Sequence, residues 1–262
     1  MNCFMYKLQI IKDDLLTEFL LQVGYLESKF ELLKDAEIST DTFSFYTSVA
    51  SVFSSKIEGE NIDLDSYIKH KGMGIAFMPD YTKKIDDLYY AYLFAQNNIL
   101  TPENIAKAHQ LLSKNIVASR FQGQLRNQNM YVTTDDGRIE YVAVMPSELQ
   151  AEIDKFYQDV TWLLKQKMSV EDVFYYAAYL HLVFVKIHPF NDGNGRSARL
   201  LEKWFIAQHL GTKAWFLQSE KNYYLLHTTY YQNLRKLGIE YQDLDYTKAL
   251  PFLLMLPKSL EL

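Results

Sequence analysis

The stretch from His188 to Arg199 reads His-Pro-Phe-Asn-Asp-Gly-Asn-Gly-Arg-Ser-Ala-Arg, and it constrains the chain more than any other segment. Gly193 and Gly195 surround Asn194. Because glycine allows positive φ and a close backbone approach, successive N–H groups in this turn can converge on an anion. The apolar residues that follow have helical spacing, which predicts a helix whose N-terminus favours phosphate. These residues are Leu200, Leu201, Trp204 and Phe205.

Four side chains of this stretch have the chemistry of a nucleoside triphosphate site. Arg196 and Arg199 are three residues apart, which would present two bidentate phosphate donors on one face of the helix. Asp192 offers a hard oxygen to Mg²⁺, which bridges phosphates through one or two carboxylates. His188 has a pKa suited to accepting a proton near neutrality. The structural alternative is a plain helix connection with an exposed Asp-Gly turn, but the combination of groups favours the nucleotide site.

The stretch also matches, position for position, the signature of the Fic family: His, any residue, Phe, any residue, Asp or Glu, Gly-Asn-Gly-Arg, two residues, Arg. The chain resembles Fic proteins more loosely from about Ser54 to Leu254. The resemblance implies a mainly α fold, a Fic-fold helical bundle with a β-hairpin flap. It also implies transfer of AMP from Mg·ATP to a hydroxyl side chain of a target protein.

The resemblance assigns a role to each signature residue. His188 would be the catalytic base and Asp192 the Mg²⁺ ligand. The residues expected to bind the phosphates of ATP are Gly193, Asn194, Gly195, Arg196 and Arg199.

A second motif lies at the end of an amphipathic helix expected at about 41–59. Glu58 would place a negative charge at the helix C-terminus, where the macrodipole disfavours it, so a partner is expected. Gly59 is expected to cap the helix. Ser54 to Gly59 resembles the Fic inhibitory motif, whose glutamate pairs with the second signature arginine, here Arg199. The resemblance implies autoinhibition by Glu58, with Ser54 and Gly59 as further regulatory positions; the alternative is a solvated carboxylate.

Between Gly123 and Met145 the hydrophobic period changes from helical to strand-like. Residues 130–134 and 139–142 flank Asp135-Asp136-Gly137-Arg138, which predicts a hairpin with an Asp-Gly turn. The region resembles the Fic flap, whose exposed strand edge would hold a Ser, Thr or Tyr-bearing segment of the target by main-chain hydrogen bonds. The alternative is a surface hairpin without a binding role.

The rest of the chain has mainly helical periodicity. Helices are expected at about 13–33, 83–98, 147–166 and 222–237, from Thr101-Pro102 onward, and from Ser169 to His188. The end of the chain, at about 244–254, resembles the last core helix of the Fic family. Tyr230 and Tyr231 resemble the family's adenine-side wall, where stacking and a phenolic hydrogen bond would act on ATP, and core packing is the alternative. His109 and His181 are expected to be hydrogen-bonded structural residues.

Length and composition limit the possible domain organisation and the possible classes of function. The 262 residues are 48% hydrophobic and suffice for a core with an appended helical lobe, expected as an N-terminal region 1–78 and a Fic core 79–262. In that core the flap would span 123–145 and the catalytic loop 188–199. The net charge of −5 excludes a broad basic surface for nucleic acid or membrane. Cys3 is the single cysteine, which excludes an intrachain disulfide.

Localisation and assembly follow from weaker signals. Neither a signal-peptide pattern nor a long apolar span is visible, so a cytoplasmic location is expected. Exposed aromatic residues would allow a homo-oligomer.

Two other classes of function stay open at this point. Glu58 could orient a water that removes AMP from a modified target, or another nucleotide or phosphate-bearing group could be transferred. The non-enzymatic alternative is a catalytically quiet nucleotide-sensing module, against which the intact base at His188 argues. The target, the activating signal and the direction of the reaction leave no recognisable pattern.

Overall fold

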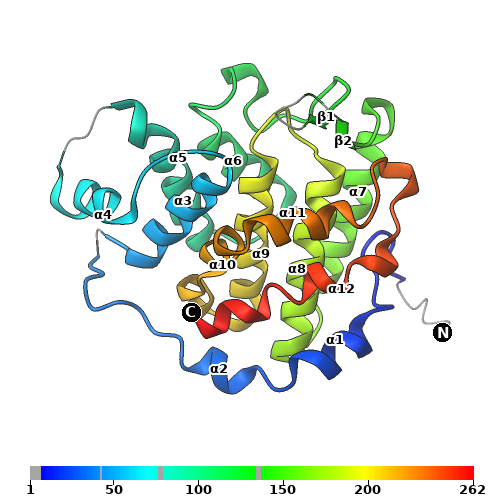
Figure 1. The fold of residues 1–262 in the computed structure, drawn as a ribbon, viewed down its shortest axis with the longest axis horizontal. Helices are drawn as coiled ribbons and strands as arrows, with labels where there is room; N and C mark the ends of the chain where they lie inside the picture. The colour runs from blue at the N-terminus through cyan, green and yellow to red at the C-terminus, as the bar shows by residue number, and fades with distance from the viewer. Residues whose placement is uncertain (1–6, 42, 76–78, 134–136, 138) are drawn as a thin grey trace.

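The computed structural model describes residues 7–41, 43–75, 79–133, 137 and 139–262, and it is mainly α-helical with one small hairpin, as predicted (Figure 1). Short 3-10 turns connect several of the helices. Within the described ranges, no helix is both long enough and apolar enough to cross a lipid bilayer. The elements are α1 (Leu16–Val23), α2 (Glu27–Glu31), α3 (Phe45–Ile57), α4 (Leu64–Met73), α5 (Pro79–Gln96), α6 (Pro102–Leu112), β1 (Tyr131–Thr133), β2 (Ile139–Val142), α7 (Pro146–Leu163), α8 (Val170–Ile187), α9 (Asn194–Leu210), α10 (Ser219–Leu225), α11 (His227–Arg235) and α12 (Leu250–Leu253).

Helices α8 and α9 lie side by side in the middle of the molecule, and the loop between them carries the signature (Figure 1). Helix α8 starts with a capping box, in which Ser169 Oγ accepts from Asp172 N and Asp172 accepts from Ser169 N. It is buried on nearly all sides, as its uniformly apolar sequence predicts. The signature loop is therefore held between the two most central helices.

The prediction of a single helix at about 13–33 is wrong, because the chain forms α1 and α2 with a break between them. Gly24, at φ 64°, ends α1 and redirects the chain. Both helices then lie on α8: Phe19 packs edge-on against Tyr175, and Phe30 packs edge-on against Phe174. The break between the two helices thus lets both phenylalanine rings reach α8.

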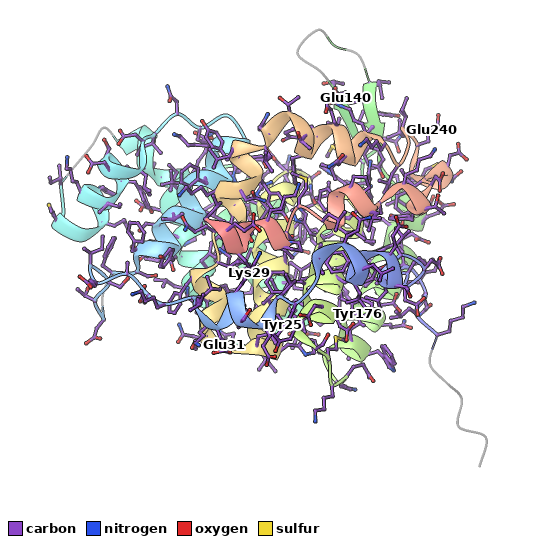
Figure 2. The ribbon with its side chains drawn as sticks, turned by 60° about the horizontal axis from the view of Figure 1, so that its bottom comes forward. Tyr25, Lys29, Glu31, Glu140, Tyr176 and Glu240 are labelled. Atoms are coloured by element: carbon purple, nitrogen blue, oxygen red, sulfur yellow. The ribbon has the colours of Figure 1, made fainter. Side chains whose placement is uncertain are left out.

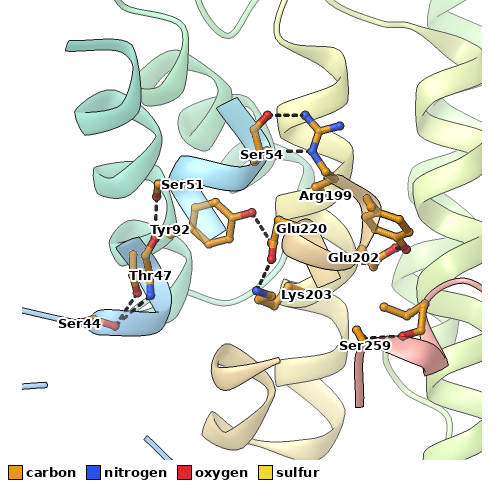
Figure 3. Close-up of polar contacts among 12 residues, drawn as sticks. Ser44, Thr47, Ser51, Ser54, Tyr92, Arg199, Glu202, Lys203, Glu220 and Ser259 are labelled. Carbon is orange, nitrogen blue, oxygen red and sulfur yellow. Dashed lines mark hydrogen bonds and ion pairs between the residues drawn. The ribbon is translucent and has the colours of Figure 1, made fainter. Parts of the chain in front are cut away.

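Helix α3 is shorter than the expected 41–59 but ends as predicted. Gly59 has φ 88°, its N–H donates to Lys56 O, and Glu60 N donates to Ser55 O, which together form a Schellman C-terminus. Most polar positions of α3 are buried as well as the apolar ones, and several of the small hydroxyls bond to neighbouring groups of the helix. For example, Ser51 Oγ donates to Thr47 O (Figure 3).

The predicted hairpin is present, with β1 antiparallel to β2 and a register irregularity between Val132 and Thr133. Of the predicted Asp-Gly turn, residues 135, 136 and 138 lie outside the described residues, and Gly137 has φ 81°. Strand β2 is also held on its other side, since Val142 N donates to Ile239 O at 2.8 Å and Val142 forms a bridge with Glu240. Figure 2 shows Glu140 and Glu240 at the same end of the molecule, away from Tyr25 and Lys29.

The expected helix at 222–237 is also wrong, because Leu226 leaves helical geometry at φ −102° and ψ 29° and separates α10 from α11. The expected last helix at 244–254 is reduced to a 3-10 turn and the four-residue α12, which begins beside Pro251. Helix α5 begins at Pro79, four residues earlier than expected. The expected domain boundary at residue 78 lies outside the described residues.

Candidate active site

The signature loop begins with a strained residue. His188 ends α8 in the left-handed region, at φ 54° and ψ 59°, and among the described residues it is the one non-glycine residue with positive φ. This conformation costs about 1 kcal/mol or more and persists only where surrounding contacts enforce it. The strain turns the chain sharply from the end of α8 into the loop.

Arg126, which lies between α6 and β1, supplies much of that enforcement. Its side chain is 3% exposed. Arg126 Nε donates to His188 O at 2.7 Å, and Nη2 donates to Val144 O at 2.5 Å. Nη1 donates to Gln128 O, and the backbone N–H donates to Pro189 O. One buried cation therefore ties both ends of the flap to the signature loop.

Replacing Arg126 by alanine is expected to lower the free energy of unfolding by about 3 kcal/mol, because it leaves several buried carbonyl groups without donors. Urea denaturation followed by circular dichroism measures this. Arg126→Lys keeps the charge but cannot reach all the carbonyls, so we expect an intermediate loss. A loss below about 1 kcal/mol for the alanine variant would show that these bonds do not hold the loop.

His109 fixes the other side of the loop, which confirms the predicted structural role. Its ring stacks on Phe190 with centroids 3.7 Å apart. Nε2 donates to Asp192 O at 2.9 Å, and Nδ1 accepts from Gly123 N at 2.8 Å. Burial lowers the pKa of His109 to about 4, so the ring stays neutral and keeps this pair of bonds at neutral pH.

The His188 ring has one nitrogen occupied and one left for chemistry. Nδ1 lies 3.2 Å from Val185 O and donates to it, which leaves the lone pair on Nε2. Burial lowers the pKa of His188 to about 4, the carbonyl of Val185 opposes this shift, and the positive charge of Arg126 adds to it. The ring is therefore a neutral acceptor at physiological pH.

The turn before α9 has the shape of an anion site. Gly193 has φ 78°, and its N–H donates to Asp192 Oδ1 at 2.6 Å. The Asn194 side chain bonds both backbone groups of Phe190, each at 2.9 Å, so it holds the loop closed. The backbone N–H groups of residues 194–196 are therefore available to a ligand, because they have no intrahelical acceptor in the first turn.

The carboxylate of Glu58 occupies this anion position. A Cβ added to Gly195 would lie 2.5 Å from Glu58 Oε1, so the glycine makes room for that oxygen. Arg199 Nη2 donates to the same oxygen at 2.5 Å. Arg199 also donates from Nε to Ser54 Oγ and from Nη2 to Ser54 O (Figure 3). Glu58 thus lies against the first turn of α9 and is paired with the second signature arginine.

The charge of Glu58 is maintained by its partners. Burial alone would raise the pKa of this carboxyl, but the guanidinium groups of Arg199 and Arg196 outweigh it and lower the pKa below its ordinary value. The Glu58 side chain is 28% exposed, whereas that of Arg199 is 1% exposed. At neutral pH the anion site is therefore filled by a charged side chain of the protein itself.

Two cavities lie on either side of Glu58. The first, here called the tyrosine cavity, measures about 150 Å³ and is lined by Arg199, His188, Tyr230 and Tyr231. The second, here called the Arg196 cavity, measures about 250 Å³ and includes Asp192. The two arginines expected on one face of the helix thus line different cavities. Glu58 lines both, and each alone is smaller than the ~300 Å³ or more of a usual ligand pocket.

Arg196 has an unused donor in this arrangement. Its side chain is 5% exposed, and its nearest carboxylate oxygen is Glu60 Oε1 at 3.7 Å from Nη2. Nε is buried and, within the described part of the chain, has no hydrogen-bond partner. A buried guanidinium with a free donor facing this site fits an anionic ligand such as a phosphate group.

Tyr230 is both a core residue and a cavity wall, so the two alternatives from the sequence are not exclusive. It is 2% exposed. Its hydroxyl lies 2.9 Å from His181 Nε2 and 3.5 Å from Arg199 Nη1. His181 Nδ1 in turn lies 2.8 Å from Glu202 Oε2, which also accepts from the Tyr223 hydroxyl. This buried network confirms a structural role for His181, while Tyr231 meets Tyr230 edge-on in the same wall.

For a metal, the candidate ligand within the signature is Asp192, because the other two carboxylates of the Arg196 cavity, Glu58 and Glu60, lie beside arginine or lysine side chains. Asp192 is exposed at the mouth of the Arg196 cavity. Among the described residues, no group of three or more His, Cys, Asp or Glu side chains is arranged to hold a metal ion. This donor set suits Mg²⁺ that takes most of its ligands from phosphate and water.

Comparison with known proteins agrees with this geometry. Residues 99–206, which include the signature loop and α6, match the sequence profile of the Fic/DOC family. The chain overlaps the crystal structure of a Fic family protein from Desulfovibrio desulfuricans G20 with a TM-score of 0.74 and 17% identity, over 97% of this chain and 74% of that one, which shows a shared fold.

Residues 99–206 therefore form a Fic/DOC family domain. Among its curated relatives is the "Protein adenylyltransferase Fic" of Nematostella vectensis, 34% identical over 79 residues. Another is the "Uridine 5'-monophosphate transferase" of Xanthomonas campestris pv. campestris, 34% identical over 92 residues. The matches cover 30% and 33% of this Fic chain, but only 16% and 17% of the relatives. The relatives support nucleotidyl transfer at the level of the family.

Proposed function

We propose that this Fic protein transfers AMP from Mg·ATP to a Ser, Thr or Tyr hydroxyl of a target protein, and that Glu58 inhibits it. The observation that carries the proposal is the carboxylate of Glu58 against Gly195 and Arg199, because it marks an anion site at the N-terminus of α9 beside a neutral histidine. The names of the curated relatives support a nucleotide as the transferred group.

In the proposed reaction the hydroxyl oxygen of the target attacks the α-phosphorus of ATP. The hydroxyl proton moves to His188 Nε2, and the bond between the α-phosphorus and the bridging oxygen breaks, which releases pyrophosphate. The backbone N–H groups of residues 194–196 would stabilise charge on the α-phosphate, and Arg196 and Arg199 would hold the β- and γ-phosphates. Catalysis would come from positioning and electrostatics, with no covalent enzyme intermediate.

Asp192 is the residue that we propose would hold Mg²⁺, with phosphate oxygens of the nucleotide and water as its other ligands. When bound, the metal would neutralise charge on the phosphates and on the leaving pyrophosphate. The Asp192 carboxylate is kept in place by the N–H of Gly193 and, through the backbone, by His109. Tyr230 and Tyr231 would stack against the adenine in the tyrosine cavity.

The flap would dock the target. Strand β2 is paired with β1 and, at Val142, with Ile239, so the outer edge of β1 is the edge we propose for an extended target segment. Val132 and Tyr141 of the flap line the tyrosine cavity beside His188. A hydroxyl on a segment added to β1 would therefore approach His188 from the flap side.

His188 is expected to stay neutral well below the pH at which an ordinary histidine takes up a proton. In the unchanged protein its ring should titrate near pH 4, where an unperturbed histidine titrates near about 6.5. Since the base works deprotonated, its capacity would be lost only as the pH falls through about 4. NMR titration of the ring signals measures this, with His188→Asn to assign the peak. A midpoint near pH 6.5 would contradict the buried, neutral base.

One experiment separates the proposal from its alternatives. The Glu58→Gly variant is incubated with Mg²⁺, a cell extract and ATP labelled on either the α- or the γ-phosphate, and modified proteins are analysed by mass spectrometry. Label from the α-position alone, with the added mass of AMP, supports the proposal. γ-Label on protein would indicate phosphate transfer, and preference for UTP would indicate UMP transfer. ATP binding without any label would favour the nucleotide-sensing module.

Removal of AMP is tested with the modified target itself. If Glu58 orients a hydrolytic water, the unchanged protein would release AMP from that target, and Glu58→Gly would not.

A further inference from the structure

A third cation lies beside the signature arginines. The Arg196 cavity is also lined by Lys84 of α5 and by Glu60, two residues beyond Glu58. Lys84 Nζ lies 2.6 Å from Glu60 Oε1, and the same oxygen lies 3.7 Å from Arg196 Nη2. One carboxylate oxygen is thus placed between two cations that come from different helices, as a phosphate oxygen would be.

The path of a triphosphate leads from His188 into this cavity. His188 lines the tyrosine cavity and is not in the wall of the Arg196 cavity. The reacting phosphorus must lie near His188, so the remaining phosphates would pass the position of Glu58 and reach Arg196. At that end lie Lys84 and Arg196 Nε, which has no hydrogen-bond partner among the residues that the structure describes.

We infer that Lys84 is a further phosphate-binding residue, which contacts the terminal phosphate together with Arg196, and that Glu60 takes the place of that phosphate when no nucleotide is bound. The inference rests on the proposed function, because it takes the ligand to be a nucleoside triphosphate. The pair of Lys84 and Glu60 is open to solvent, at 41% and 23% side-chain exposure, so exchanging the carboxylate for phosphate costs little.

Glu60 then parallels Glu58. Each carboxylate follows the end of α3, and each lies beside one signature arginine: Glu58 beside Arg199 and Glu60 beside Arg196. A displacement of the end of α3 would free both arginines and Lys84 together.

Binding without turnover tests this inference. Calorimetry would measure the affinity of ATP, AMP and inorganic triphosphate for the Glu58→Gly/His188→Asn variant, in which nucleotide transfer is expected to be blocked. Adding Lys84→Met should weaken ATP and inorganic triphosphate about tenfold and leave AMP unchanged. Lys84→Arg should retain most of the affinity. Lys83→Met is the matched control, since Lys83 is an exposed lysine on the same helix that does not line the cavity, and it should change nothing.

Glu60→Gln should change the affinity for ATP in the opposite direction. It should strengthen ATP binding several-fold, because a neutral amide competes less for the two cations. Unchanged ATP affinity in Lys84→Met, or an equal loss for ATP and AMP, would overturn the role of Lys84. If ATP and inorganic triphosphate fail to bind even with Lys84 intact, the proposed function itself fails.

Discussion

Glu58→Gly is expected to raise the rate of nucleotide transfer about 100-fold at limiting ATP. In the unchanged protein, Glu58 Oε1 lies 2.5 Å from Arg199 Nη2 and fills the space beside Gly195. A productively bound triphosphate must displace this carboxylate. Separating a largely buried ion pair costs about 3 kcal/mol, and each 1.4 kcal/mol is about a tenfold change in population. The initial rate of transfer from α-labelled ATP to protein measures the effect.

Two further variants separate charge from shape. Glu58→Gln keeps the side-chain length and can still accept from Arg199, so we expect a smaller gain of about tenfold. Asp65→Asn removes an exposed carboxylate from α4, where its partner is Lys69, and should leave the rate unchanged. An unchanged rate in Glu58→Gly, or a gain of equal size in Asp65→Asn, would remove Glu58 as the barrier to ATP.

The part of the candidate site whose residues lie close together in the sequence was predictable. His188, Asp192 and the glycine turn stand in one loop, so their spacing alone pointed to phosphate and a base. The partner of Arg199 was predictable only because Glu58, 141 positions away, lies in a second recognisable motif. The structure places these residues together.

The residues that the sequence did not reveal act across the fold. Arg126 bonds to backbone carbonyls, which every residue type carries, so no pattern of side chains marks its partners. Glu60 and Lys84 belong to different elements and meet only after α3 packs against α5. Such contacts depend on tertiary packing and leave no periodicity in the chain.

The same distinction applies to the fold. Two helices with a side-chain cap, at Thr101 and Ser169, were predictable at their start. The break at Leu226 carries neither glycine nor proline, so the helical period continues through it in the sequence. At Gly24 the breaking residue was visible, but the apolar period resumed beyond it. Beyond Gly24 the chain turns so that both α1 and α2 pack on α8.

Replacing His188 is expected to reduce transfer about 1,000-fold in the Glu58→Gly background, since a positioned general base contributes roughly 10²–10⁴ to such rates. His188→Asn is the better variant for this measurement. Asparagine tolerates the left-handed backbone at φ 54° better than alanine, so the loop should keep its course. ATP affinity should stay within about threefold, because His188 accepts a proton from the target and does not hold the phosphates.

His209→Ala serves as the matched control, since this histidine is on the last turn of α9 and lines neither cavity. It should transfer label at the rate of its parent. Transfer by His188→Asn within tenfold of the parent rate, with ATP binding intact, would show that another group or water takes the proton. A parallel loss of ATP binding would instead indicate that the ring shapes the site, and comparing rate with affinity distinguishes the two roles.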